Sequence, residues 1–290
     1  MICRVCDSNN LDQVIDLGFQ PWCNHFLNKE EIGKEPFYPL RVLFCQACRT
    51  SQLDFTVKKE IMFGDHTYLS GTTKSLSDHF KKVAIEIDGR FFASKTDKNV
   101  LDIGSNDGTQ LKHFQALGYE VLGVESSKST AGIANSAGVP TMNAFFNEKT
   151  MKTIGKQFDV FNASGVFFHL EELHSVCRAI KQGLKDDGVF VVQFLYMKSI
   201  MENLAFDQIY HEHLLYYTLD TIEVLLNRHG LSMFDAYLAP IHGGAVIGYV
   251  THQGSRSPED RLQVMRQDEK ESGCNTIEAY LEFDQKIRDM

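Results

Sequence analysis

From Asn99 onward the chain alternates short apolar segments with amphipathic ones, and this alternation constrains the fold more than any other feature. NVLDIGSNDG is an apolar strand that ends in a glycine-rich turn, and TQLKHFQALG is an amphipathic helix that ends at Gly118. The strand YEVLGVESS, the helix SKSTAGIANSAG, the strand FDVFNAS, the helix EELHSVCRAIKQGL and the strand GVFVVQF continue the series. Strands and helices at this spacing predict an α/β fold, with a parallel sheet covered by helices on both faces.

The composition is that of a globular protein: 290 residues, 43% hydrophobic and 23% charged. The longest apolar run, VFVVQFLYM, is too short to cross a bilayer, so we expect no membrane partner. The N-terminus MICRVCDSN lacks the pattern of a secretory signal, and we therefore expect a cytoplasmic protein. A net charge of −9 without any basic run favours a small-molecule substrate over nucleic acid.

Cysteines form two C-x-x-C pairs, Cys3 with Cys6 and Cys45 with Cys48. Disulfides are rare in the cytoplasm, whereas two such pairs supply the four sulfurs of a closed, structural zinc site. Chance pairs or a redox dithiol are the alternatives, and the doubled motif favours zinc. Cys23, Cys177 and Cys274 are isolated, and we interpret them as ordinary residues.

Residues 1–60 carry seven basic side chains against eight acidic ones. A zinc ribbon often binds nucleic acid, but a slightly acidic one neutralises phosphates poorly. We therefore predict that this zinc-binding part is a structural lid or docking module.

The turn after the first strand indicates a cofactor. A dinucleotide fold needs G-x-G-x-x-G, and here the middle glycine is absent. The form D-x-G-x-x-x-G instead suits S-adenosylmethionine, whose ammonium group Asp102 or Asp107 can attract. Glu125, about twenty residues further on, ends the second strand and is placed to accept the ribose hydroxyls, and Asn143 is placed to meet the adenine. The predicted cofactor residues are Asp102, Gly104, Asn106, Asp107, Gly108, Glu125 and Asn143.

Several motifs together resemble the zinc-containing sugar C-methyltransferases, the nucleotide-sugar C-3-methyltransferases of deoxysugar pathways. They are the cysteine pairs, DHTYLSGTTKS, LDIGSNDG, GYEVLGVESS, FDQIYHEHLLYY and PIHGG. The resemblance implies a small N-terminal zinc-binding domain and a Rossmann-like methyltransferase domain that uses S-adenosylmethionine. Members of the family also have a C-terminal domain, and we expect it to be truncated or absent here, because the chain stops in IEAYLEFDQKIRDM.

By the same resemblance, the substrate is a nucleotide-linked 4-keto-deoxysugar that is methylated at C3. The carbon beside the ketone must lose a proton to a base with a pKa near neutrality, and hydrogen-bond donors must stabilise the enolate oxygen. Histidine suits the first role. We predict His213 as the base, Glu212 as an orienting residue, and Tyr210 and Tyr68 as proton relays or enolate donors.

The segment YHEHLLYY, residues 210–217, follows the fifth strand, where ligands bind in such sheets. In a straight strand Tyr210 and Glu212 would lie on the face opposite His213. The resemblance assigns all three to one site, so we predict an irregular loop or a helix start here. A metal site at His211 and His213 is disfavoured, because residue 215, four positions after His211, is a leucine and no third ligand is evident.

His169 and His242 are candidate substrate-binding residues, with a purely structural role as the alternative for each. Gly243 and Gly244 allow close approach of the backbone to a substrate, or form a hairpin turn, or both.

The expected organisation is a zinc-binding domain (residues 1–60), a helical linker that contributes to the substrate pocket (61–95), a methyltransferase domain (96–255) and a C-terminal helical segment (256–290). Two alternatives to sugar C-methylation stay open: an O- or N-methyltransferase for another small molecule, and a non-catalytic zinc- and cofactor-binding module.

Overall fold

The computed structural model describes residues 1–24, 26–64 and 68–290. His25 and three residues of the DHTYLS segment, Asp65, His66 and Thr67, lie outside the described residues. No helix in the described ranges is both long enough and apolar enough to cross a membrane.

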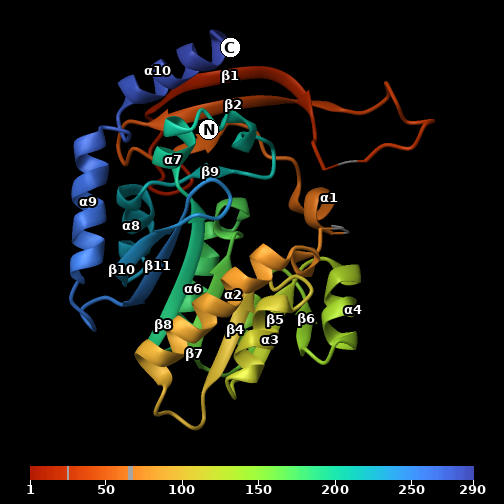
Figure 1. Ribbon diagram of the computed structural model, residues 1–290. Coiled ribbons are helices and arrows are strands. Elements are labelled where there is room, and N and C mark those ends of the chain that lie inside the picture. Colours follow the sequence, from red (N-terminus) through yellow and green to blue (C-terminus); the bar gives the residue numbers. More distant parts are fainter. Residues whose placement is uncertain (25, 65–67) are drawn as a thin grey trace.

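The predicted α/β domain is built on a seven-stranded sheet in the order β10-β11-β8-β7-β4-β5-β6 (Figure 1). Its strands are β4 (Asn99–Ile103), β5 (Glu120–Glu125), β6 (Thr141–Asn143), β7 (Phe158–Ser164), β8 (Leu184–Leu195), β10 (Leu231–Ala239) and β11 (Ala245–His252). Strands β4 to β8 pair in parallel, as predicted, whereas β11 is antiparallel to both of its neighbours. Only β11 runs opposite to the other strands, because a tight loop, rather than a helix, connects it to β10.

Helices cover both faces of this sheet, as predicted, because successive strand residues point to opposite sides. Val100 and Val160 belong to the apolar cluster on the face covered by α2 and α3, whereas Leu101 and Phe161 belong to the cluster that includes α6. The helical elements of the domain and its approach are α2 (Lys74–Ile87), η2 (Asp88–Phe92), α3 (Thr109–Ala116), α4 (Lys128–Ser136), α5 (Glu148–Ile154), η3 (Phe167–His169), α6 (Leu173–Gly183), α7 (Met197–Glu202), η4 (Phe206–Gln208) and α8 (Leu219–Asn227).

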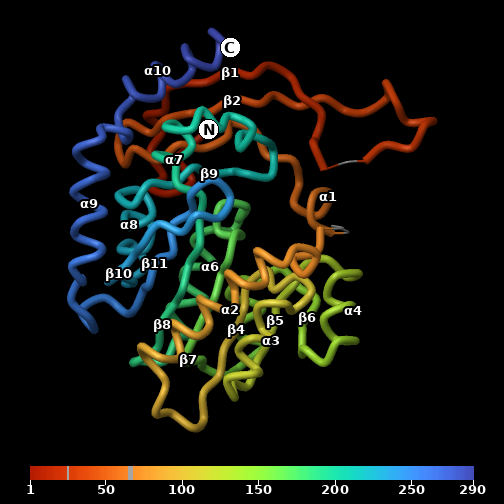
Figure 2. Tube along the Cα trace, viewed as in Figure 1, coloured from red at the N-terminus to blue at the C-terminus, as the bar shows by residue number. Residues whose placement is uncertain are grey.

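The N-terminal part forms a second sheet, in the order β1-β2-β3-β9. Its strands are β1 (Leu11–Pro21), β2 (Phe37–Cys45), β3 (Ser51–Leu53) and β9 (Leu215–Tyr216), and α1 (Lys59–Phe63) and η1 (Ser70–Thr72) follow them along the chain. The far end of the β1–β2 hairpin projects from the body; we call its described residues, 19–24 and 26–37, the arm (Figure 2).

Strand β9 joins the two sheets, although it is only two residues long. Leu215 pairs with Gln52 and Tyr216 with Ser51, so the last position of the N-terminal sheet is filled by the segment YHEHLLYY. The same segment also contacts the larger domain: the Leu214 amide donates a hydrogen bond of 2.8 Å to the carbonyl of Phe168, which lies in η3 after β7.

Two helices end the described chain, α9 (Asp260–Ser272) and α10 (Ile277–Arg288). Helix α9 packs on β10, and α10 lies along β1 (Figure 1). Tyr280 of α10 is fully buried, with its ring 5.2 Å from that of Phe44 in β2. The C-terminal segment is therefore held by both sheets.

Candidate active site

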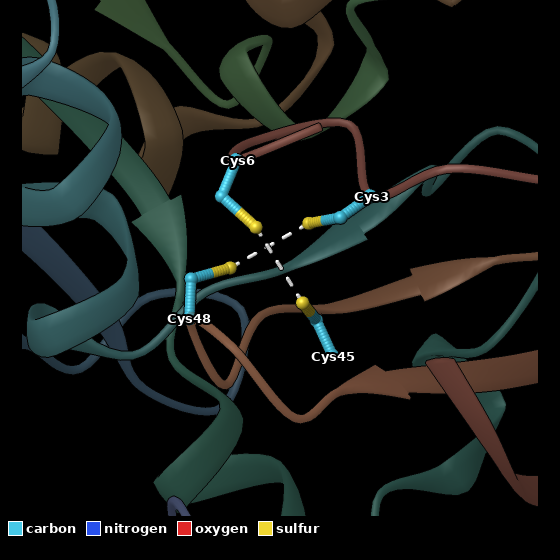
Figure 3. A group of neighbouring side chains, drawn as sticks. All are labelled: Cys3, Cys6, Cys45 and Cys48. Carbon is cyan, nitrogen blue, oxygen red and sulfur yellow. Dashed lines mark hydrogen bonds between the residues drawn. The ribbon is translucent and has the colours of Figure 1, made fainter. Parts of the chain in front are cut away.

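The four paired cysteines lie together, with their sulfur atoms turned toward one another (Figure 3). In each pair the residue after the second cysteine has a positive φ, 65° at Asp7 and 64° at Arg49. Each turn is closed by a backbone hydrogen bond, from Asp7 to Cys3 at 3.0 Å and from Arg49 to Cys45 at 2.7 Å. The two pairs thus form matching turns that present sulfur to a common centre.

The spacing of the sulfur atoms fits zinc. Cys3 Sγ lies 3.5 Å from Cys48 Sγ, and Cys6 Sγ lies 3.6 Å from Cys45 Sγ. A tetrahedral zinc ion with Zn–S bonds of about 2.3 Å needs sulfur atoms about 3.8 Å apart, so a small outward movement accommodates the ion. Because four protein sulfurs complete the coordination, such a site is structural.

A cavity of about 190 Å³ lies at the ends of β4, β5 and β7; we call it the first cavity. Three of the predicted cofactor residues, Gly104, Asn106 and Glu125, line it. Ligands bind at this edge of open α/β sheets, where the strand ends leave a crevice.

Glu125 holds the glycine-rich turn in place. Its carboxylate accepts hydrogen bonds from the Asn106 amide at 2.9 Å and from the Ser127 amide at 2.8 Å. Gly104 has a φ of 67°, and a Cβ there would lie 2.9 Å from the Val166 side chain. The turn therefore needs glycine at this position for both its conformation and its packing.

Two predicted cofactor residues, Asp102 and Asp107, do not line the first cavity. Asp102 is 3% exposed and accepts a hydrogen bond of 2.6 Å from Asn162, and burial raises its pKa to about 7. The Asp107 carboxylate accepts from the amides of Gly71 at 2.8 Å and Thr109 at 3.0 Å. The Asp102 side chain therefore connects β4 to β7, and the Asp107 side chain connects the glycine-rich turn to η1 and to the start of α3.

Gly108 and Asn143 also lie beside the first cavity and not on its wall. Gly108 has a φ of 77°, and a Cβ there would lie 2.9 Å from Val139. The Asn143 side chain donates to the carbonyls of Glu125 and Ser126, both at 2.9 Å. These contacts connect the end of β6 to the end of β5.

Aromatic residues that sequence analysis missed complete the first cavity. Phe145 and Phe146 follow β6, and Phe63 ends α1. Lys59 lies 4.7 Å above the Phe145 ring and pairs with Glu172 at 2.7 Å. The signal was the pair of phenylalanines at positions 145 and 146, directly downstream of the predicted cofactor residue Asn143.

A second cavity of about 340 Å³ adjoins the first. Six residues line both cavities: Tyr68, Ser70, Ser164, Gly165, His169 and Glu212. All four predicted catalytic residues lie on its wall, namely Tyr68, Tyr210, Glu212 and His213. The six shared residues place the two cavities side by side.

The backbone at Tyr210–His213 is a turn, and the irregular shape predicted for this segment is confirmed. The His213 amide donates to the Tyr210 carbonyl at 3.0 Å, which closes the turn. The rings of Tyr210 and His213 consequently lie on the same side, with centroids 3.9 Å apart. His211 points away, toward Tyr38 of β2, at a ring distance of 5.7 Å.

The His213 ring has a defined tautomer. Its Nδ1 lies 2.8 Å from the Gln208 carbonyl, which only accepts, so Nδ1 carries the proton and Nε2 keeps its lone pair. Burial, with His169 nearby, lowers the pKa of His213 well below its usual value. The ring is therefore neutral at pH 7. Burial raises the pKa of Tyr210 and of Tyr68, so both hydroxyls keep their protons and remain potential donors.

Glu212 is held by the arm. Trp22 Nε1 and Asn24 Nδ2 donate to the same carboxylate oxygen, at 2.9 Å and 2.7 Å. Sequence analysis missed both donors. The signal was the single tryptophan of the chain, lying between the cysteine pairs.

His169 and His242 both line the second cavity. His169 Nδ1 lies 2.6 Å from the Glu212 carbonyl. Burial lowers the pKa of His242, which sits in the loop between β10 and β11 with a φ of 52°. Gly243 and Gly244 form the rest of this hairpin loop and do not line the cavity, and a Cβ at Gly244 would lie 2.7 Å from Ser199.

Three family models match consecutive parts of the chain. Residues 3–63 match a model described as "Putative zinc binding domain", and residues 77–235, more than half of the chain, match "Methyltransferase domain". The chain belongs to the methyltransferase-domain family. This methyltransferase depends on S-adenosylmethionine, and its paired cysteines form a zinc-binding site.

Residues 240–290 of this methyltransferase match "C-methyltransferase C-terminal domain". The expectation that this domain is absent is therefore wrong. The matched part includes β11, α9 and α10, which pack on the rest of the fold instead of forming a core of their own. The sequence of the last helices is charged and shows no apolar core of its own, so the local pattern did not indicate that they belong to this domain.

One curated relative is the C-methyltransferase NovU of Streptomyces niveus. It is 28% identical over 286 residues, which cover 97% of this chain and 68% of NovU. Among solved structures, the PH0226 protein of Pyrococcus horikoshii OT3 is similar at 15% identity and a TM-score of 0.50, over 68% of this chain and 100% of that chain. The structural likeness supports the fold alone.

Proposed function

We propose that this methyltransferase transfers a methyl group to carbon, at C3 of a nucleotide-linked 4-keto-deoxysugar. The single observation that carries the proposal is the place of His213, neutral and with a free Nε2 lone pair, on the wall of a cavity that adjoins the cofactor cavity. The C-methyltransferase NovU is a relative over nearly the whole chain, which favours carbon as the acceptor.

Glu125, Gly104 and Asn106 would hold the cofactor, because they form the polar part of the first cavity. The positive φ of Gly104 and Asn106 opens the backbone there. Phe145 and Phe146 supply an apolar wall for the adenine. When bound, S-adenosylmethionine would supply an electrophilic methyl group, which leaves the sulfonium sulfur as the enolate carbon of the substrate takes it up.

His213 would act as the base. Its Nε2 takes the proton from the carbon beside the ketone, and the electron pair of that C–H bond moves toward the ketone oxygen. The Nδ1–H bond to the Gln208 carbonyl fixes the ring and stabilises the positive charge that the imidazole gains. Tyr210 and Tyr68 keep their hydroxyl protons and would donate to oxygens of the substrate.

Charge supports a sugar in the second cavity. Among the described residues that line it there is neither lysine nor arginine, and Glu212 is the only carboxylate. A diphosphate buried there would lack a partner, whereas an uncharged sugar ring finds amide, imidazole and hydroxyl groups. The nucleotide would therefore lie outside this cavity.

The test incubates the protein with methyl-labelled S-adenosylmethionine and a panel of dTDP-4-keto-deoxysugars, and locates the methyl group by NMR. Methyl on carbon supports the proposal, whereas methyl on oxygen or nitrogen selects the alternative activity. His213→Gln should lower kcat by roughly 100-fold or more, as expected for loss of a general base. His211→Gln is the matched control, because His211 faces β2 and not the cavity.

A further inference from the structure

One polar side chain interrupts the buried, apolar part of strand β8, residues 189–195. Gln193 stands between Val192 and Phe194, both of which are fully buried. Gln193 itself is 3% exposed and lines the second cavity. A buried amide in the middle of an apolar strand costs free energy unless its donors and acceptors are satisfied.

Gln193 lies where the two cavities meet. It is the pairing partner of Ser164 in β7, and its carbonyl accepts a hydrogen bond of 3.1 Å from Gly165. Ser164 and Gly165 line both cavities. The Gln193 side chain therefore lines the second cavity beside residues that this cavity shares with the first.

His79 fixes the orientation of this amide. His79 Nε2 lies 2.7 Å from Gln193 Oε1, so the ring nitrogen donates to the amide oxygen. His79 belongs to α2 and does not line the second cavity. With its oxygen occupied, Gln193 turns its NH₂ group to the cavity. Within residues 1–24, 26–64 and 68–290, nothing accepts a hydrogen bond from this group.

We propose that Gln193 donates a hydrogen bond to the ketone oxygen of the substrate, and that His79 is the positioning residue that aims it. This inference rests on the proposed C-methylation. As His213 removes the proton, negative charge develops on the ketone oxygen, and the amide stabilises it without transferring a proton. The described residues that line this cavity include neither lysine nor arginine, and an oriented neutral donor is most effective where charge appears only in the transition state.

The experiment compares the wild-type protein with Gln193→Leu, Gln193→Glu, His79→Leu and the double variant Gln193→Leu/His79→Leu. Loss of one such donor should lower kcat by roughly 100-fold in Gln193→Leu. KM should change by less than about 3-fold, because the interaction strengthens only in the transition state. Gln193→Glu should lose at least as much, because a carboxylate lacks the N–H and repels the enolate.

His79→Leu should lower kcat less than Gln193→Leu, and should have no further effect once Gln193 is leucine. Binding of S-adenosylhomocysteine by calorimetry and the zinc content show whether each variant is folded. Gln157→Leu, at the opposite end of β7, is a control that should leave turnover unchanged.

If the wild-type protein methylates a keto sugar but kcat is unchanged in Gln193→Leu, or activity is near normal in Gln193→Glu, the inference is wrong and the proposed function stands. A wild-type protein that methylates no keto sugar would overturn the proposed function, and the inference with it. Independent, additive losses in the double variant would overturn the role of His79.

Discussion

Trp22 donates a hydrogen bond of 2.9 Å to Glu212, although 190 positions separate the two residues in the chain. Trp22 belongs to the arm of the zinc-binding part, and Glu212 is the direct neighbour of His213. The zinc-binding part thus contributes to the wall of the candidate active site, through Asn24 as well.

Trp22→Phe removes one donor to the carboxylate and keeps the aromatic bulk. A hydrogen bond to a charged group contributes about 1.5–3 kcal/mol, so we expect a loss of about 10-fold in kcat/KM. Steady-state kinetics checks this. Phe19→Ala on the same arm, where Phe19 is 66% exposed, should be neutral. Full activity of Trp22→Phe would show that the contact does not serve catalysis.

Zinc removal should abolish activity as well as unfold the N-terminal sheet, because the cysteine turns flank the strand that pairs with β9. Chelation or Cys45→Ser should release the metal, and most of the turnover should be lost with it. Metal analysis, circular dichroism and activity measured on one sample check this. Cys23→Ser, at an exposed cysteine outside the cluster, is the matched control. Turnover that persists in metal-free protein contradicts the prediction.

The pH dependence of kcat/KM should reflect His213. Protonation removes the Nε2 lone pair, so activity falls on the acidic side of the pKa. Because burial lowers that pKa below 6.5, activity should hold as the pH falls from 7.5 to 6.5 and decline only below it. A pH–rate profile measures this. An acidic limb centred above pH 6.5 would count against His213 as the base.

Gly104→Ala should weaken binding of S-adenosylmethionine more than Gly118→Ala. Both positions have a positive φ, 67° and 82°, so alanine is strained at both. Only at Gly104 does the added Cβ meet another side chain, that of Val166 at 2.9 Å, whereas nothing lies within 4 Å at Gly118. We expect a loss of 10-fold or more in affinity for Gly104→Ala by calorimetry, at about 1.4 kcal/mol per tenfold. Equal affinities would contradict this account.

Acid should destabilise the fold below pH 6.5. A histidine whose pKa is lowered by folding binds fewer protons than in the unfolded chain, so its contribution is present above 6.5 and is lost as pH falls toward the folded pKa. Among the described residues, seven histidines have lowered pKa values: His79, His113, His174, His211, His213, His229 and His242.

Asp102, with its pKa raised to about 7, acts in the opposite direction, since its contribution is lost as pH rises. The histidines outnumber it, so the melting temperature should fall between pH 7.5 and 5.5. Thermal denaturation at constant ionic strength measures this, and an unchanged or rising melting temperature contradicts it.

Features that depend on residues close together in the sequence could be predicted. The alternation after Asn99 predicted the parallel strands and both layers of helices, and the cysteine spacing predicted the cluster of four sulfurs. The family resemblance, which assigns Tyr210 and His213 to one site, predicted a turn where simple alternation would have separated them.

Contacts between residues far apart in the sequence could not be predicted from such patterns. Nothing in the neighbourhood of Trp22 indicates Glu212, and nothing around Leu215 indicates Gln52, because each pair meets only when the two sheets dock. Gln193 is different. Its polarity within an apolar strand was visible in the sequence, but its partner His79 lies on another element.

The two-residue strand β9 has a consequence for synthesis on the ribosome. The N-terminal sheet cannot close its last edge until Leu215 and Tyr216 have left the exit tunnel, well over 100 residues after the cysteine turns. Until then β3 is an unprotected edge that invites pairing with other nascent chains. The same dependence means that residues 1–60 cannot be grafted onto another enzyme as a self-contained module without bringing a substitute for β9.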